Sequence, residues 1–256
     1  MARVLVPLPD RDFDVTEVAV PWKILTRLGH EVVFATEHGG TAPTCDPLLL
    51  TGVLFGKLGA EPEPKAFYEA MATSPEFRAP LAWRDVSVTD FSGLVLPGGH
   101  APGMRQYLEG EELFPKVAEF FARELPVGAI CHGTVVLART RGASSKSVLF
   151  GRKSTSLPKY MERSAYLSTF WKLGRYYRTY PEYVEDEVTR NLASPADYRR
   201  GPFHLSARGT DTDDSPAFVV EDGNYLSARW PGDAYLFAKR FAARLGSERA
   251  RENREK

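Results

Sequence analysis

A cysteine and a histidine stand side by side at what the sequence predicts to be a tight turn between a strand and a helix. Apolar residues fill 127–130, Cys131 and His132 follow, and Gly133 opens a helical segment that ends near Arg139. A nucleophile at such a turn has a strained backbone and an exposed side chain. Because a helix N-terminus favours a thiolate, the pattern predicts a reactive thiol. A buried structural cysteine beside an incidental histidine is the alternative.

Two further segments should meet the cysteine, because open parallel sheets bind ligands at the carboxyl ends of their strands. Glu17 begins the first predicted helix, and a buried carboxyl beside a thiol can move protons on and off a substrate. Gly98 and Gly99 follow a predicted strand and let the backbone approach a ligand. The N–H groups of Gly99 and His132 would then form an oxyanion hole, with His100 in the pocket or at its rim. The alternatives are a glutamate that only complements the helix dipole and an ordinary glycine-rich turn.

The identity of the base is less well determined by the sequence. His132 is the nearest candidate, but adjacent side chains diverge at a sharp turn, so a direct hydrogen bond with the thiol needs an unusual arrangement or a third group. His204 is a possible remote base. No histidines, cysteines or acids have the spacing of zinc ligands, so we expect no metal, and no cofactor is expected either.

Five other titratable residues are expected to play no part in the chemistry. Cys45 is predicted to pack in the interior, as free cysteines commonly do. His30 and His38 lie at the opposite end of a strand pair and are expected to be structural or exposed. Asp12 and Asp14 are close to Glu17 in sequence, but as acidic loop residues they are expected to be solvated.

Composition excludes several classes of partner. The 256 residues contain 33 basic and 33 acidic side chains, a net charge of zero, which gives no general attraction to nucleic acid or anionic membrane. Two cysteines make no disulfide framework, no apolar run is long enough to span a bilayer, and the first residues resemble a strand rather than a signal peptide. We therefore expect a cytoplasmic protein. Aromatic and basic residues interleave over 166–180, which is more typical here of a lid or subunit interface than of base stacking.

The order of the predicted elements favours an α/β fold with a mostly parallel sheet and right-handed crossovers. Predicted strands cover 4–6, 31–35, 91–96 and 127–130, and predicted helices cover 17–28, with Thr16 as N-cap, 64–71, 111–123 and 134–139. Later elements are a strand within 147–155, a helix over 159–171, a hairpin of 218–220 with 225–228, and a helix over 234–245. We expect one domain over 1–246, with irregular insertions near 43–85 and 174–215 and a frayed charged tail over 247–256.

Three motifs, in this order, resemble the PfpI/ThiJ superfamily, the class I glutamine-amidotransferase-like group. They are Thr-Glu-Val-Ala-Val-Pro-Trp at 16–22, Leu-Pro-Gly-Gly-His at 96–100 and Ala-Ile-Cys-His-Gly at 129–133. The resemblance implies a flavodoxin-like three-layer sandwich with a nucleophile elbow. It also implies that Cys131 is the nucleophile, that His132 is its neighbour in the elbow, that Glu17 hydrogen-bonds the thiol and that Gly99 supplies an oxyanion N–H.

The same resemblance extends to a later motif at 227–232, which contains Trp230. Gly98, His100 and Trp230 are accordingly expected to contact substrate.

The glyoxalase branch of the superfamily is the most similar, so the resemblance implies conversion of methylglyoxal or a related α-oxoaldehyde to a 2-hydroxy acid. The chain has no His-x-Glu pair after the elbow, which argues against glutamine hydrolysis. A cysteine hydrolase or hydratase, such as an amidase, peptidase or isonitrile hydratase, is one alternative. A non-catalytic redox sensor or chaperone, with Cys131 oxidised beside Glu17, is the other. The expected partners are a small-molecule substrate and a second copy of the chain.

Overall fold

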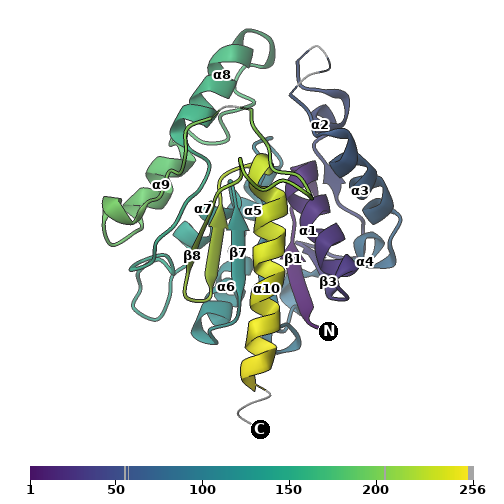
Figure 1. The fold of residues 1–256 in the computed structure, drawn as a ribbon, viewed down its shortest axis with the longest axis vertical. Coiled ribbons are helices and arrows are strands. Elements are labelled where there is room, and N and C mark those ends of the chain that lie inside the picture. Colours follow the sequence, from purple (N-terminus) through teal and green to yellow (C-terminus); the bar gives the residue numbers. More distant parts are fainter. Residues whose placement is uncertain (55, 57, 205, 253–256) are drawn as a thin grey trace.

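A seven-stranded sheet forms the centre of the molecule in the computed structural model, which describes residues 1–54, 56, 58–204 and 206–252 (Figure 1). The strand order is β5-β3-β1-β6-β7-β9-β8, and every neighbouring pair is parallel except β8 with β9. These strands are β1 (Arg3–Pro7), β3 (Glu31–Thr36), β5 (Leu81–Ala82), β6 (Gly93–Leu96), β7 (Val127–Ile130), β8 (Val219–Asp222) and β9 (Tyr225–Ala228). The predicted mostly parallel sheet is confirmed.

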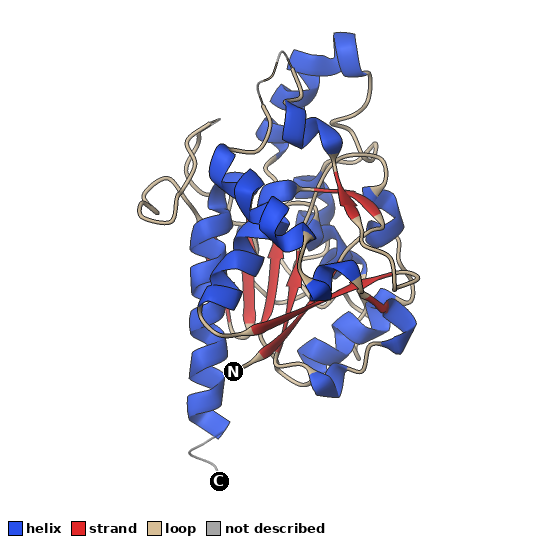
Figure 2. Ribbon diagram, turned by 90° about the vertical axis from the view of Figure 1, so that its right-hand side faces the viewer, coloured by secondary structure: helices blue, strands red, loops and turns tan. Residues whose placement is uncertain are grey.

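Helices cover both faces of this sheet (Figure 2). The helices are α1 (Val15–Arg27), α2 (Pro47–Thr51), α3 (Pro62–Ala72), α4 (Pro75–Arg78), α5 (Met104–Leu108), α6 (Leu113–Ala122), α7 (Gly133–Arg139), α8 (Lys159–Leu173), α9 (Val184–Arg190) and α10 (Ala234–Glu252). Helix α1 packs against α10 and α3, and α7 packs against α5, α6 and α9. The predicted α/β sandwich of helices around a sheet is therefore confirmed.

The central strands are apolar because they are buried on both faces, as the strands of parallel sheets usually are. All four residues of β6 and of β7 are buried. Gly128 within β7 lets α10 lie close to the sheet, since a methyl group there would lie 2.7 Å from the ring of Phe237. This close packing fixes the position of β7 relative to α10, and with it the position of the residues that follow β7.

The start of α1 differs from the prediction. Asp14, not Thr16, is the N-cap, and its Oδ1 accepts hydrogen bonds from the backbone N–H groups of Thr16 (2.8 Å) and Glu17 (3.0 Å). Aspartate is among the preferred N-cap residues because its carboxylate satisfies N–H groups that have no partner within the helix. The cap places Glu17 in the first turn of the helix.

Both predicted insertions contain regular structure. In 43–85, β4 (Thr44–Cys45) pairs in parallel with β2 (Arg11–Phe13), which lies in a segment predicted to be a loop, and β5 adds an edge to the central sheet. In 174–215 the acidic run 185–187 forms the first turn of α9, where negative charge favours the helix dipole. The prediction that 174–215 is irregular is therefore wrong over α9.

The strand predicted within 147–155 is absent from the part of the chain that the structure describes. Ser147 and Ser154 make only isolated bridges, to Arg141 and Tyr198. The segment bonds to β9 through other groups: the backbone N–H of Thr155 donates to the hydroxyl of Ser227, and the hydroxyl of Ser154 lies 2.9 Å from that of Tyr225.

The last helix is longer than predicted. Helix α10 runs to Glu252 rather than ending near Leu245, because the charged segment is rich in arginine, glutamate and alanine, which are good helix formers. A frayed tail is predicted over 247–256, and the last four of these residues lie outside the described part of the chain. Among the described residues, no helix is both long and apolar enough to cross a membrane.

A buried ion pair closes the connection from β9 to α10. Arg229 and Asp233 are each fully buried, with Arg229 Nε 2.9 Å from Asp233 Oδ2 and a second guanidinium nitrogen 2.8 Å from Oδ1. The carboxylate also accepts the backbone N–H of Phe218, and the guanidinium donates to the carbonyl of Pro202. This network fixes the turn that carries Trp230.

Replacing Asp233 with alanine should strongly destabilise the fold, because it leaves the charge of Arg229 buried without a partner. We expect a loss of about 3–5 kcal/mol in the free energy of unfolding, measured by urea denaturation. Glu31→Ala is the control, because it breaks the exposed Arg3–Glu31 pair and should cost less than about 1 kcal/mol. Equal losses in the two variants would contradict this account of the turn.

Candidate active site

Three loops from neighbouring strands meet at one edge of the sheet, as the sequence predicts. The backbone N–H of Asp14 donates to the carbonyl of Gly98 (2.9 Å), and the N–H of Gly98 donates to Glu17 Oε2 (2.8 Å). A methyl group on Gly98 would lie 2.7 Å from the His132 backbone nitrogen and 3.0 Å from Cys131 Cβ. The glycine thus permits close contact between the loops. Its N–H is bonded to Glu17 and is not presented to a ligand.

Cys131 lies at a strained elbow. Its φ angle is 56°, in the left-handed region that side chains rarely adopt, and it is 4% exposed. Gly133 begins α7 so close to the end of β6 that a methyl group on it would lie 2.1 Å from the carbonyl oxygen of Leu96. Only glycine fits there, so the turn can be as tight as the nucleophile requires.

The imidazole of His132 lies between the thiol and a threonine. Its Nδ1 is 3.5 Å from Cys131 Sγ, and its Nε2 is 3.4 Å from Thr179 Oγ1. The Thr179 hydroxyl donates its proton to the carbonyl of His100 (2.7 Å), so it can only accept from Nε2. The hydrogen bond therefore favours the tautomer with the proton on Nε2, which leaves Nδ1 unprotonated and facing the sulfur. The left-handed backbone of Cys131 and the contact with Thr179 together permit this direct approach, and no sequence signal marks Thr179.

Burial determines the charge of His132. It lowers the pKa of the imidazole to about 3, with smaller contributions from His100 and Arg139. The ring is consequently neutral at ordinary pH and can act as a hydrogen-bond partner of Cys131.

Glu17 and Cys131 form a buried acid–thiol pair. Burial, and then the charge of Asp14, raise the pKa of the Glu17 carboxyl well above its usual value. Burial also raises the pKa of the Cys131 thiol, followed by the charges of Glu17 and Asp14, whereas the backbone N–H of His132 opposes this rise. The prediction that the helix N-terminus favours a thiolate is therefore wrong for the resting site. Burial thus favours the neutral form of each group, and the state in which both are charged is the least stable.

Asp14 is a site residue that the sequence interpretation missed. It is 4% exposed rather than solvated, and burial raises the pKa of its carboxyl to about 6. Its spacing from Glu17, Asp-x-x-Glu before an apolar helix, is that of a capping box and could have identified it. Asp12 is half-buried and accepts the N–H of Gly103 instead.

A cavity of about 570 Å³ opens over this pair. Of the predicted substrate-contacting residues, Gly99, His100 and Trp230 line it, together with Cys131 and Glu17. The side chain of His132 is buried and does not line the cavity, since it lies on the Thr179 side of the thiol. Figure 1 shows α8 and α2, which carry lining residues, on opposite sides at the top of the molecule.

Other predicted candidates lie away from the thiol. His204 Nε2 lies 3.1 Å from a guanidinium nitrogen of Arg229, and neither residue lines the cavity. Cys45 is buried in the hydrophobic interior, and burial raises the pKa of its thiol to about 11. His30 accepts the N–H of Ala2 near the start of β1.

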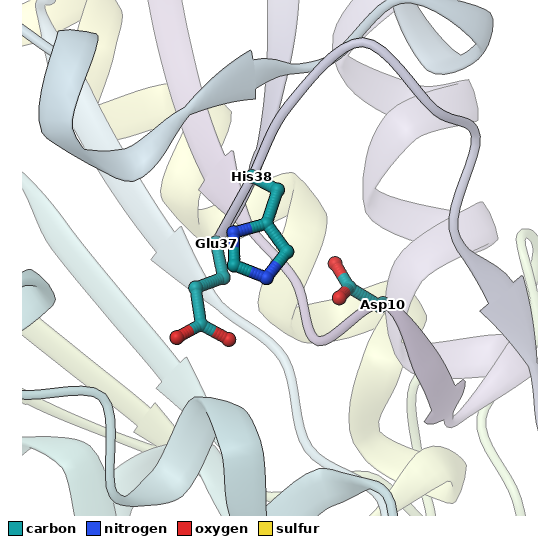
Figure 3. A group of neighbouring side chains, drawn as sticks. All are labelled: Asp10, Glu37 and His38. Carbon is teal, nitrogen blue, oxygen red and sulfur yellow. The ribbon is translucent and has the colours of Figure 1, made fainter.

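One group of side chains has the composition of a cation site. Asp10, Glu37 and His38, which follow β1 and β3, present ligand atoms within 4.8 Å of one another (Figure 3). The amide of Gln106 donates to both carboxylates, so each already has a hydrogen-bond partner. Sequence spacing could not reveal this group, because Asp10 follows β1 whereas Glu37 and His38 follow β3. Two of its three members are exposed, and nothing observed there indicates a bound ion.

Comparison with known proteins identifies the family to which this chain belongs. Residues 8–202 match the ThiJ/PfpI family-like sequence model, so the chain belongs to this family. It is 27% identical over 243 residues to a deglycase of Pyrococcus abyssi, covering 95% of this chain and 99% of that protein. It is 35% identical over 175 residues to an uncharacterised protein of Schizosaccharomyces pombe, covering 64% of this chain and 62% of that protein, less than two thirds of its length.

Solved structures show the same fold at lower identity. Glyoxalase III from Candida albicans superimposes with a TM-score of 0.67 at 18% identity, covering 94% of this chain and 96% of that one. The 24 kDa rapid encystment protein of Francisella tularensis gives a TM-score of 0.70 at 17% identity, covering 96% and 99%.

Replacing Asp14 with asparagine should stabilise the protein at neutral and alkaline pH. Asparagine preserves the cap but removes a buried carboxyl whose pKa rises from 3.8 to about 6 on folding. Well below pH 3.8 the carboxyl is protonated in both folded and unfolded chains, so burial of charge costs nothing, and at pH 4 the cost is only a small fraction of its full value. Above pH 6 the folded state bears the full cost, and we expect the variant's free energy of unfolding to be higher by about 1–3 kcal/mol.

Urea denaturation at pH 4 and pH 8 measures the difference. Asp90→Asn is the matched control, because Asp90 is exposed, and it should change stability by less than about 0.5 kcal/mol at either pH. A gain in stability for Asp14→Asn at pH 4 as large as that at pH 8 would argue against the burial of this charge.

Proposed function

We propose that this protein is a cysteine-dependent enzyme that converts methylglyoxal or a related α-oxoaldehyde to a 2-hydroxy acid. The observation that carries the proposal is the pair of Cys131 and Glu17, a thiol and a buried carboxyl of raised pKa that face the same cavity. Such a carboxyl suits proton transfer near neutral pH. The names of two relatives, a deglycase and a glyoxalase III, support a reaction of glycating carbonyl compounds.

In the first step, Glu17 takes the proton of the Cys131 thiol as the sulfur attacks the aldehyde carbon. The new carbon–sulfur bond displaces the carbonyl electron pair onto oxygen, which the N–H groups of Gly99 and His132 would stabilise. Glu17 then returns the proton to this oxygen, which gives a hemithioacetal. The raised pKa makes the ionised Glu17 carboxylate a stronger base toward the thiol than an ordinary carboxylate.

In the second step, Glu17 removes the proton from the former aldehyde carbon and delivers it to the neighbouring carbon through an enediol. The hydroxyl proton of the first carbon is transferred to the oxygen of the second. The first carbon is thereby oxidised to a thioester and the second is reduced to an alcohol. Water hydrolyses the thioester, releasing the 2-hydroxy acid and the thiol. No external oxidant or cofactor is required, because the redox change occurs within the substrate.

A deglycase reaction is the second candidate, favoured by alignment with a deglycase over nearly the full length of both chains. It would use the same thiol on a carbonyl adduct of an amine or thiol and release the unmodified group. Release of free amine from methylglyoxal-treated amino acids, compared with production of lactate from free methylglyoxal, distinguishes the two. We also propose that the chain forms a homodimer, which light scattering during size-exclusion chromatography can measure.

Replacing either member of the pair should abolish turnover. We expect kcat/KM for methylglyoxal to fall by about 10²–10⁴-fold in Glu17→Gln, because the proton relay is lost, and at least as far in Cys131→Ser. Lactate formation is the measurement.

Cys45→Ala is the control, since Cys45 lies in the hydrophobic interior, and it should keep the wild-type rate. If Cys131→Ser still produces lactate at the wild-type rate, the proposal is wrong. Failure of the wild type to turn over any oxoaldehyde, with stoichiometric oxidation of Cys131 by peroxide, would favour the redox-sensor alternative.

A further inference from the structure

The cavity over Cys131 is much larger than a three-carbon oxoaldehyde. Its volume of about 570 Å³ lies within the range of roughly 300–1,000 Å³ that is typical of sites for drug-sized ligands. A water molecule occupies about 30 Å³ of the liquid, and methylglyoxal occupies only a few times that volume. Most of the cavity would therefore remain unfilled by methylglyoxal.

The cavity is large partly because the face of α8 that lines it carries small side chains. The lining residues Met161, Ser164, Ala165 and Ser168 follow the spacing i, i+3, i+4 and i+7, which is one face of a helix. Three of the four are serine or alanine. Larger residues at these positions would reduce the volume of the cavity from the side of α8, whereas Cys131 lies on the elbow after β7.

The other walls are largely apolar. They include Leu49 and Ala60 from the 43–85 insertion, Leu157 before α8, and the rings of Tyr177 and Trp230. Flat aromatic walls and aliphatic side chains favour an apolar group on the ligand.

The charges on the walls leave no free cation for an anionic tail. Arg208 is the basic residue among the described residues that line the cavity, and its guanidinium stacks over Trp230 at 4.8 Å. It lies 3.7 Å from a carboxylate oxygen of Glu61 and interacts electrostatically with Asp14. Glu162, another lining residue, is paired with Arg178. The paired Arg208 and the several carboxyl groups of the lining disfavour an anionic group on the ligand.

We propose that the substrate of this site is an uncharged α-oxoaldehyde with an aromatic or branched apolar group, which lies between Trp230 and the Ser164–Ala165–Ser168 face of α8. The proposal rests on the function proposed above and names its substrate class. The aldehyde carbon lies at Cys131 and the apolar group fills the distant part of the cavity. Methylglyoxal is then a slow substrate that uses only the inner end.

Phenylglyoxal and methylglyoxal are the probes, compared by initial rates of formation of mandelate and lactate. We expect kcat/KM to be at least about tenfold higher for phenylglyoxal in the wild type, since apolar pockets discriminate by this order. Ala165→Phe should fill the distant part of the cavity. It should lower kcat/KM for phenylglyoxal at least about tenfold and leave kcat/KM for methylglyoxal nearly unchanged.

Leu167→Phe is the matched control, because it adds bulk to the same helix at an exposed residue outside the cavity lining. It should leave both rates unchanged. Equal efficiency for the two aldehydes in the wild type, or an equal loss for both in Ala165→Phe, overturns the substrate class while the proposed function stands.

A measurement without turnover separates the two proposals. Mandelate should protect Cys131 from alkylation by iodoacetamide at a concentration at least about tenfold lower than lactate, and Ala165→Phe should abolish this advantage. If neither aldehyde is turned over, the proposed reaction fails, and protection by mandelate still supports the apolar occupant. Equal protection by mandelate and lactate overturns it.

Discussion

The hydrogen bond from the Gly98 N–H to Glu17 is the contact on which the site depends. Glu17 occupies the third position of α1, from which a glutamate ordinarily bonds back to the N-cap backbone N–H. Here the N–H of Asp14 is donated to the Gly98 carbonyl, so the carboxyl of Glu17 bonds to Gly98 instead. Its other oxygen is buried and has no hydrogen-bond partner among the described residues. The loops after β1 and β6 thus aim a carboxyl at the thiol.

The elbow after β7 completes this arrangement through close backbone contact. Gly133 lies against the carbonyl of Leu96, and Gly98 lies against the backbone of His132, so β6 and β7 cannot separate without moving Cys131. Tight packing also excludes water, which raises the pKa of the carboxyl and of the thiol together. The same constraint that positions the two groups therefore also disfavours a charge on either of them.

The sequence predicts the parts of the site that depend on local pattern. The strand before Cys131, the glycines around it and the helix after Glu17 follow from apolar runs, turn residues and periodicity, and strand order then brings their loops together. The pairing of Thr179 with His132 joins residues 47 positions apart through an aromatic segment without periodicity, so no local rule could find it. The sequence does not reveal that Asp14 is buried, because exposure depends on which later segments cover a loop. It does not reveal the raised pKa of the Cys131 thiol either, because the helix dipole is a local effect whereas desolvation depends on the whole fold.

The segment from α8 to α9 determines both the shape of the cavity and the support of the residue beside the nucleophile. Its helix forms the roof of the cavity, and a few residues later Thr179 bonds to the imidazole beside the thiol. Grafting this segment between relatives, to exchange what the cavity admits, would also exchange the support of the nucleophile. Substitutions on the inner face of the helix change the cavity without altering the spacing between the helix and Thr179, whereas insertions between the two would alter it. Engineering should begin with point changes on that face.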